Sequence, residues 1–569
     1  MCALLLLGNG EGIIVMDNED RENEGDLIFA AEKATPELLA FTIRYSSGYI
    51  CVGTHPDRLD ELELPLMVKD STDPLRTQYT VSVDAAEGVT TGISAADRSR
   101  TIRLIGDFSN KAPASLRRPG HVLPLRARRN GVLERGGHTE AAIDLTRLAG
   151  LSPAGALCEL VNDDGSMKRR DDCVAFAREH GLRLITISDL VAYRKAHAIR
   201  AADALPPNIG RASRVHALID AFGLDSSVDI VEPVPLTNAE LTTFHSPEYI
   251  RCLLSQTPEE TSSGGEGSGY SSADGSDGNG PIGKEAALAR HGLMYDCPLF
   301  DQIEQHIRYA AGGTVTAANA LGFGRARIAI HWEGGRHHAK RSKASGFCYV
   351  NDIVLGILQL QKRFARVLYI DLDLHHGDGV QDAFIYSDKV MTLSIHHHAR
   401  GFYPNTGGSS VEGKGRGARH SVNIPLDRGA SDSSFLRAFS AVASHVYTSF
   451  APDVVVVQCG CDGLAGDPYK IFNLSTDAFV GALELIVSWK LPVLMVGGGG
   501  YNSTDCARCW TRLTAVACGI DIAPGEDVPE HVYLDEYAPA FDMCVEKMLV
   551  GDQNTDLAID AIIAQTATV

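Results

Sequence analysis

The chain has 569 residues, 44% of them hydrophobic and 22% charged, which is the composition of a folded protein and excludes a largely disordered chain. Its length predicts more than one domain. The net charge of −20 argues against direct nucleic-acid binding; it either favours cationic partners or serves solubility alone.

The first elements along the chain predict an α+β or α/β domain with an acidic loop. Residues 12–16 read as a strand that runs directly into DNEDRENEGD at 17–26. Two Gly-His turns are predicted downstream, RPGH at 118–121 and RGGHT at 135–139. Residues 137–150 have the start and stop signals of a helix, 173–181 predict a second helix, and 182–188 predict a strand.

The acidic loop and the two histidines predict a metal site in this first part. Carboxylates combined with a distant imidazole suit a hard divalent cation. The alternative is that this acidic segment is simply an exposed loop, as most runs of charged residues are. Arg135 and Thr139 flank glycines at a helix start, which suits a phosphate group.

Together with AAEGVTTGISAADR at 85–98 and CELVNDDG at 158–165, these motifs resemble 3,4-dihydroxy-2-butanone 4-phosphate synthase of riboflavin biosynthesis over residues 12–197. The resemblance implies a homodimeric lyase that converts ribulose 5-phosphate to that product plus formate with Mg²⁺ or Mn²⁺. It implies metal binding by Glu22 and His138, catalysis by His121 and Glu159, and substrate binding by Arg21, Asp26, Arg135, Gly136, Gly137 and Thr139. Cys51 is either a substrate neighbour or a buried structural residue.

In the second half, apolar strand segments alternate with longer helical segments, which predicts an α/β fold with a largely parallel sheet. Strands are expected at 326–331, 366–370, 390–395, 453–458 and 493–496, with longer helix-compatible segments between several of them. The Gly- and Ser-rich segment 262–283 is expected to be a flexible insertion within this domain. Ligands bind at the carboxyl ends of such strands, where the polar clusters of this sequence fall.

YIDLDLHHGDG at 369–379 predicts a divalent metal site at one of these strand ends. Side chains alternate along a strand, so Asp373 and His375 can share a metal, and Asp462 is the best third ligand. Asp371 and Asp378 would then orient imidazoles. His337 and His338 are the candidate acid and base, and Tyr501, after four glycines, can stabilise an oxyanion. We expect His396-His397-His398 to be an ordinary loop and Cys506-Ala-Arg-Cys509 to be structural.

GGRHHAKRSKASGFCYVND, YIDLDLHHGDGV, GCDGLAGDP and GGGGYN resemble the class I zinc-dependent histone deacetylases over residues 205–545, with an arginase/deacetylase-like fold. The resemblance implies hydrolysis of acetyl-lysine and a role in chromatin regulation, with zinc on Asp373, His375 and Asp462. The implied acid/base pair is His337 with Asp371 and His338 with Asp378, and Tyr501 polarises the acetyl carbonyl. The other implied roles are an acyl-lysine tunnel lined by Gly346, Phe347 and Phe402, a substrate-backbone contact at Asp296, an internal channel at Arg211, and potassium beside Ser394. Arg336 departs from the family, which has an apolar residue there.

We therefore expect a synthase-like domain at 1–198 and a deacetylase-like domain at 199–569. The stretch between them, AYRKAHAIRAADALPPNIGRAS at 192–213, leaves no room for the deacetylase family's opening strand. The synthase family's first helix is likewise expected to be missing or replaced before Ile13. Three alternatives remain: a synthase half that only dimerises, a C-terminal half that only binds acyl-lysine, or two gene products joined in translation.

The expected location is inside the cell, in the nucleus or the cytoplasm. Thirteen cysteines at irregular spacing predict reduced thiols. No run approaches the roughly 20 apolar residues of a membrane span, so no membrane contact is expected. The expected partners are an acetylated histone or another acetylated protein, ribulose 5-phosphate, and a second copy of the synthase part.

Overall fold

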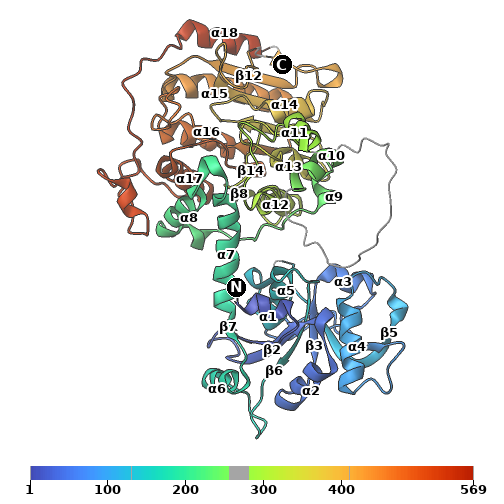
Figure 1. The fold of residues 1–569 in the computed structure, drawn as a ribbon. Helices are drawn as coiled ribbons and strands as arrows, with labels where there is room; N and C mark the ends of the chain where they lie inside the picture. The colour runs from blue at the N-terminus through green and yellow to red at the C-terminus, as the bar shows by residue number, and fades with distance from the viewer. Residues whose placement is uncertain (1, 130, 256–280, 409–410, 568–569) are drawn as a thin grey trace. The chain divides into compact units, whose positions relative to one another are not determined.

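The structure is a computed structural model that describes residues 2–129, 131–255, 281–408 and 411–567. The chain divides into two compact units, Met1–Ala196 and His197–Val569 (Figure 1). Each unit has its own seven-stranded sheet. The two units are therefore described one after the other.

The N-terminal unit is built on a mixed sheet with the strand order β4-β5-β3-β6-β2-β1-β7. Its strands are β1 (Ile13–Met16), β2 (Gly25–Ala30), β3 (Cys51–Thr54), β4 (Val83–Ala85), β5 (Leu116–Arg126), β6 (Ala154–Glu159) and β7 (Leu184–Thr186). Only β3–β5 and β1–β7 pair in parallel. The central strands β1, β2 and β3 are buried along their whole length, because helices cover the sheet on both faces.

Alternating side chains of this sheet supply two separate hydrophobic clusters. Phe29 and Val52 pack with α2 (Pro36–Tyr45), α3 (Pro56–Glu61) and α4 (Ala95–Gly106). Their neighbours Ile28 and Cys51 face the other way and pack with α1 (Cys2–Gly8) and α5 (His138–Leu148). α6 (Arg170–His180) covers β1 in a third cluster. The short helix α1 occupies the place where we expected the family's first helix to be missing or replaced.

The C-terminal unit is built on a sheet with the strand order β11-β12-β10-β9-β13-β14-β8. Its strands are β8 (Ile328–His331), β9 (Val367–Asp371), β10 (Val390–His397), β11 (Val411–Glu412), β12 (Ser421–Leu426), β13 (Val454–Gln458) and β14 (Val493–Val496). The short β11 is antiparallel to β12, and the other six strands run in parallel. This confirms the predicted α/β fold with a largely parallel sheet.

Helices cover both faces of this second sheet, which explains its continuous apolar strands. In β13, Val455 and Val457 face the cluster with α15 (Asp432–Phe450), α16 (Thr476–Ser488) and α17 (Ser503–Cys518). Val454 and Val456 face α12 (Ile303–Gly322) and α13 (Asp352–Leu360). The remaining helices are α8 (Arg211–Ala221), α9 (Asn238–Leu241), α10 (Pro247–Leu254), α11 (Pro281–Arg290), α14 (Asp378–Phe384) and α18 (Asp556–Thr566).

The stretch between the two expected domains is largely helical. α7 runs from Ile187 to Asp203, so the predicted strand at 182–188 shortens to β7, and the boundary between the two units falls inside α7. Among the described residues from Ile187 to Arg327, none contributes a strand to the second sheet. β8 is consequently the edge strand of that sheet.

Two local expectations were wrong, and a third differs at its end. His396 and His397 are not in a loop, because β10 continues through His397, with His396 bonded to Ser394 and His397 to the carbonyl of Leu426. The RPGH segment at 118–121 is not a turn but part of β5. The last three residues of the expected insertion 262–283 begin α11, and its other residues lie outside the described ones.

None of the described helices combines the length and the apolar character needed to cross a membrane. Cys506 and Cys509 both lie in α17 as buried free thiols. Their burial fits the expected structural role. Cys51 is also buried, within the cluster that contains α5, and its burial raises the pKa of its thiol.

Candidate active sites

Three predicted metal ligands come together at the carboxyl edge of the C-terminal sheet. Asp373 and His375 follow β9, and Asp462 follows β13, the strand beside β9. One ligand atom from each lies within 4.8 Å of the others, and all three residues are buried. Two carboxylates and one imidazole at an enclosed position fit a zinc ion with one open coordination site.

The surrounding backbone and a glutamine hold these carboxylates in place. The Oδ2 atom of Asp373 accepts hydrogen bonds from Gln458 Nε2 at 2.7 Å and from the backbone N of Gly499 at 2.8 Å. The Oδ1 atom of Asp462 accepts from the backbone N of Leu374 at 2.8 Å. Gln458 is the last residue of β13, so the sheet itself fixes the ligand geometry.

The electrostatics of the three ligands are those of a cation site. Burial disfavours a charged imidazole, but the carboxylates of Asp462 and Asp373 together outweigh burial and raise the pKa of His375 to about 10. Burial and the charge of Asp373 raise the pKa of Asp462 to about 6. His375 and Asp462 therefore hold their protons more tightly than usual when no metal is bound. A buried site with this excess of negative charge favours a cation.

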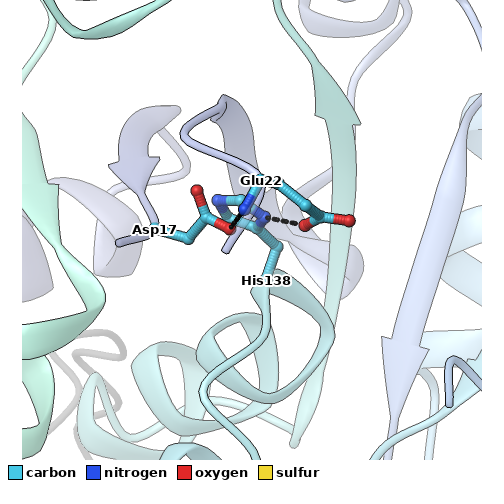
Figure 2. Close-up of side chains that lie close together, drawn as sticks. All are labelled: Asp17, Glu22 and His138. Carbon is cyan, nitrogen blue, oxygen red and sulfur yellow. Dashed lines mark hydrogen bonds and ion pairs between the residues drawn. The ribbon is translucent and has the colours of Figure 1, made fainter. Parts of the chain in front are cut away.

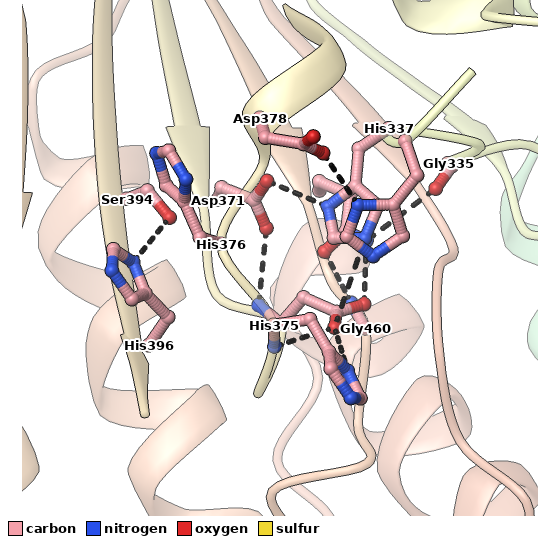
Figure 3. Close-up of polar contacts among 12 residues, drawn as sticks. Gly335, His337, Asp371, His375, His376, Asp378, Ser394, His396 and Gly460 are labelled. Carbon is pink, nitrogen blue, oxygen red and sulfur yellow. Dashed lines mark hydrogen bonds and ion pairs between the residues drawn. The ribbon is translucent and has the colours of Figure 1, made fainter. Parts of the chain in front are cut away.

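Both predicted imidazole–carboxylate pairs are present (Figure 3). His337 Nδ1 lies 2.8 Å from Asp371 Oδ2, and His338 Nδ1 lies 2.7 Å from Asp378 Oδ1. Each pair leaves the Nε2 atom of the ring available for proton transfer. Burial lowers the pKa of His338 to about 3, whereas the carboxylates of Asp371 and Asp373 outweigh burial and raise the pKa of His337 to about 9. Opposite environments of this kind suit an acid/base pair.

Aromatic rings surround the metal ligands, and two of them were missed in the sequence. The predicted tunnel residue Phe402 stacks on His375 at 5.1 Å, and Phe347 contacts Tyr501 at 6.0 Å between ring centroids. Tyr403 also packs against His338, and Tyr469 packs against His375. The only sequence signals were that Tyr403 follows Phe402 and that Tyr469 lies seven residues after Asp462.

A hydrogen bond joins Asp296, predicted at the substrate rim, to Gly346, predicted to line the acyl-lysine tunnel. Asp296 is exposed, and its Oδ2 atom accepts a hydrogen bond from the backbone N of Gly346 at 2.7 Å. Gly346 has φ of 53°, and a Cβ there would collide with the ring of His338. The rim therefore requires glycine at this position.

Tyr501 is positioned by a carboxylate that the sequence did not single out. Its backbone N donates to Asp467 Oδ2 at 2.8 Å. Burial raises the pKa of the Tyr501 hydroxyl well above its usual value, so the group stays protonated and can donate. Burial and Asp462 raise the pKa of Asp467 to about 7. Ser394 bonds to His396 and pairs in register with Asp371, while potassium beside it stays a prediction.

A second metal-ligand cluster lies in the N-terminal unit and contains Asp17, Glu22 and His138 (Figure 2). Asp17 follows β1, Glu22 lies in the acidic loop, and His138 is the first residue of α5. The Nε2 atom of His138 lies 3.1 Å from the carbonyl of Val15, which leaves Nδ1 as the ligand atom, 3.8 Å from Glu22. Sequence reasoning missed Asp17, although it opens the acidic loop directly after a buried strand.

Arg21 and Asp26 flank this cluster, and their role in substrate binding stays a prediction. Arg21 bonds to Asp17 at 2.7 Å and also pairs with Glu22. Asp26 is buried, and its Oδ1 atom lies 3.5 Å from His138. Burial, followed by the negative charge of Glu159, raises the pKa of Asp26 well above its usual value. This side of the cluster therefore gains from a bound cation.

The two predicted catalytic residues of this unit lie on separate strands. Glu159 ends β6 and pairs in register with Asp26. His121 lies in β5, and its Nδ1 atom is 2.7 Å from Asp84, a residue that the sequence did not single out. β3 separates β5 from β6, and its Cys51 pairs with Leu123 on one side and Leu157 on the other. His121 and Glu159 therefore lie at the same edge of the sheet, two strands apart.

In the turn at 135–139, predicted to bind a phosphate, some of the polar groups are already engaged within the protein. Gly137 is the N-cap of α5, so the first backbone N–H groups of the helix, near Thr139, have no partner within the helix itself. The Arg135 guanidinium, however, is engaged with Glu140 at 2.5 Å, with Thr77 at 2.9 Å and with the carbonyl of Leu75. Substrate binding by Gly136, Gly137 and Thr139 stays a prediction, and the Arg135 side chain is engaged by other groups of the protein.

Comparison with known families assigns both units. The family model of the histone deacetylase domain matches residues 205–517, and that of 3,4-dihydroxy-2-butanone 4-phosphate synthase matches residues 3–193. Histone deacetylase 8 of Xenopus tropicalis is 40% identical over 353 residues, which cover 62% of this chain and 89% of that protein. Histone deacetylase 1 of Homo sapiens is 40% identical over 352 residues, which cover 62% of this chain and 68% of that protein.

Proposed function

The chain belongs to the histone deacetylase family, and we propose that its C-terminal unit hydrolyses N6-acetyl-lysine in histones or other proteins with zinc on Asp373, His375 and Asp462. The observation that carries this proposal is the buried cluster of these three ligands beside two imidazole–carboxylate pairs. A zinc ion bound there supplies Lewis acidity toward the acetyl carbonyl.

The side chains of the site have complementary tasks in this reaction. The Nε2 atoms of His337 and His338 remove a proton from the attacking water and deliver one to the departing lysine amine, while Asp371 and Asp378 hold the rings. The hydroxyl of Tyr501 donates to the acetyl oxygen as negative charge develops there. The aromatic rings around His375 exclude bulk water.

Tyr501→Phe tests the role of this hydroxyl. We expect kcat for acetate release from an acetyl-lysine peptide to fall about 10²- to 10³-fold, because one oxyanion donor is lost. The KM and the zinc content should stay close to those of the unchanged protein, since Tyr501 is not a metal ligand. The exposed Tyr386 supplies the matched control, Tyr386→Phe. A kcat within tenfold of the unchanged protein, or loss of zinc, would contradict the role.

We propose that the N-terminal unit converts ribulose 5-phosphate to 3,4-dihydroxy-2-butanone 4-phosphate and formate. The supporting observation is the cluster of Asp17, Glu22 and His138, whose oxygen-rich ligand set suits Mg²⁺ or Mn²⁺. Glu159 and His121 with Asp84 are the proton carriers of this proposal. A coupled assay for formate tests it directly and separates catalysis from a role in dimerisation alone.

The domain limits and partners that go with these functions are also proposals. Residues 1–198 are the synthase-like domain and residues 199–569 the deacetylase-like domain. The synthase-like domain forms a homodimer, which sedimentation equilibrium of the full chain tests. A histone or another acetylated protein is the substrate of the deacetylase-like domain. The nucleus or the cytoplasm remains the predicted location.

A further inference from the structure

Five basic side chains gather at the amino edge of the C-terminal sheet, in the two turns that lead into β8 and β9. Arg325 and Arg327 lie between α12 and β8, and Lys362, Arg363 and Arg366 lie between α13 and β9. The two helices pack against each other on one face of the sheet, so the turns that follow them are neighbours. All five residues are exposed, and we call them the basic patch.

Aromatic rings hold three arginines of the basic patch in place. The guanidinium carbon atoms of Arg363 and Arg325 lie 5.1 Å and 5.8 Å from the centroid of one ring, that of Phe323. Arg366 lies 6.0 Å from the ring centroid of Phe450. The Phe323 side chain is itself 58% exposed, so the two turns meet around an aromatic residue at the surface. Contacts of this kind restrict a guanidinium group but leave its N–H donors available to a ligand.

The positive charge of the basic patch is only partly balanced by its surroundings. Among the described residues, none of the five side chains forms an ion pair, and Lys362 donates to the side-chain oxygen of Gln359 instead. Asp453 lies beside the patch, but its Oδ2 atom accepts from the backbone N of Ala365 at 3.0 Å and of Arg366 at 2.8 Å. Cations often accompany helix ends, yet each end carries only about half a negative charge. The ends of α12 and α13 together with Asp453 therefore leave most of the five positive charges uncompensated.

The basic patch is set apart both from the charge of the whole chain and from the proposed zinc site. The chain has a net charge of −20, but the Debye length is about 8 Å at physiological salt, so a ligand at the patch is influenced mainly by the five cations. Arg366 precedes β9, whereas Asp373 and His375 follow it. The five residues of β9 span about 16 Å. The patch therefore lies at the opposite edge of the sheet from the proposed active site.

We propose that the basic patch is a docking surface for an acidic segment of a partner protein. Guanidinium groups offer paired N–H donors that match the two oxygens of a carboxylate, and the exposed ring of Phe323 adds an apolar contact between them. A short acidic segment confines its charge to the patch. Duplex nucleic acid would instead extend its charge along the surface of a chain whose net charge is −20. A partner held at this edge leaves the proposed active site open to its substrate.

Fluorescence anisotropy of a labelled peptide of alternating glutamate and alanine, titrated with the full-length chain, tests the proposal. Arg325→Gln combined with Arg363→Gln should weaken binding of this peptide about tenfold, because each exposed ion pair contributes up to about fivefold in affinity. The matched control is Arg251→Gln combined with Arg428→Gln, which removes two exposed positive charges elsewhere in the same unit. This control should bind the peptide as the unchanged protein does. A peptide with glutamine in place of glutamate should bind the unchanged protein far more weakly.

Equal peptide affinity in Arg325→Gln/Arg363→Gln and the unchanged protein would overturn the docking surface. Equal binding of the glutamate and glutamine peptides would overturn it without any variant, so the test does not depend on the folding of the substituted chain. Displacement of the glutamate peptide by an acetyl-lysine peptide would place it at the proposed active site instead. Tighter binding of duplex DNA than of the glutamate peptide would contradict the assignment to an acidic polypeptide. Because binding is measured without turnover, failure of the docking surface and absence of deacetylase activity are separate results.

Discussion

Asp462→Ala is expected to reduce acetate release from acetyl-lysine peptides by more than about 100-fold and to remove zinc from the protein. Loss of a group that only orients a ligand costs 10- to 100-fold in metal affinity or activity, so loss of a ligand should cost more. The substitution removes one of three ligands, the acceptor of the Leu374 N–H and the partner of His375. Acetate release and zinc content per chain are the two measurements.

Formate release from ribulose 5-phosphate should be unchanged in Asp462→Ala, because Asp462 belongs to the other compact unit. Asp521→Ala, at an exposed position of the same unit, is the control and should keep both zinc and acetate release. Loss of both activities in Asp462→Ala, or of neither, would contradict the assignment of two independent sites.

Glu22→Gln is expected to produce the reverse result, a loss of formate release by more than about 100-fold with acetate release unchanged. The substitution keeps the shape of the side chain and removes the negative charge that faces His138 Nδ1. A hard divalent cation prefers a carboxylate, so metal affinity should fall with activity. Formate production over a titration of Mg²⁺ or Mn²⁺ measures both effects.

Glu19→Gln is the matched control for this prediction, since Glu19 lies exposed in the same acidic loop and outside the ligand cluster. It should retain formate release. Asp17→Asn should behave like Glu22→Gln if Asp17 is the third ligand. Full activity of Glu22→Gln at all metal concentrations would show that the cluster does not hold the catalytic metal.

The residues of the C-terminal site that could be predicted from the sequence lie in short motifs that directly follow buried strands. Asp371, Asp373 and His375 follow one strand and Asp462 follows its neighbour, so the parallel topology alone brings them to one edge. The pairing of His337 with Asp371 and of His338 with Asp378 came with the family resemblance. The structure places all four within hydrogen-bond distance of their partners.

The parts that were missed depend on contacts between distant segments. Asp84 meets His121 across the β4–β5 pairing, and Asp467 meets Tyr501 through a loop contact. Asp84 lies outside the quoted motifs, and Asp467 lies in GCDGLAGDP, where nothing in the sequence indicates its contact with Tyr501. Asp17 is an exception, because its place directly after a buried strand was visible and only its role was not recognised.

Three segments of strand were missed or misassigned because their residues have a low propensity for strands. β12 has the sequence SVNIPL and was not predicted, because serine, asparagine and proline are uncommon in strands. In the structure it is buried between β10 and β11. The RPGH segment has turn residues, yet it lies within β5, at a register shift of the β4–β5 pairing between the paired residues Arg117 and Val122. His396 and His397 are polar, but each finds a hydrogen-bond partner inside the sheet, which makes their burial tolerable.

The central claim is that one continuous chain carries both sites, and mass spectrometry of the native protein tests it most directly. Cleavage after glutamate should give a peptide of residues 180–240, since Glu179 and Glu240 bracket the junction and Glu232 between them is followed by a proline, which blocks cleavage. One continuous chain gives this peptide together with an intact mass of at least 61.0 kDa. Two smaller proteins, one for each unit, with no peptide across the junction, would contradict it.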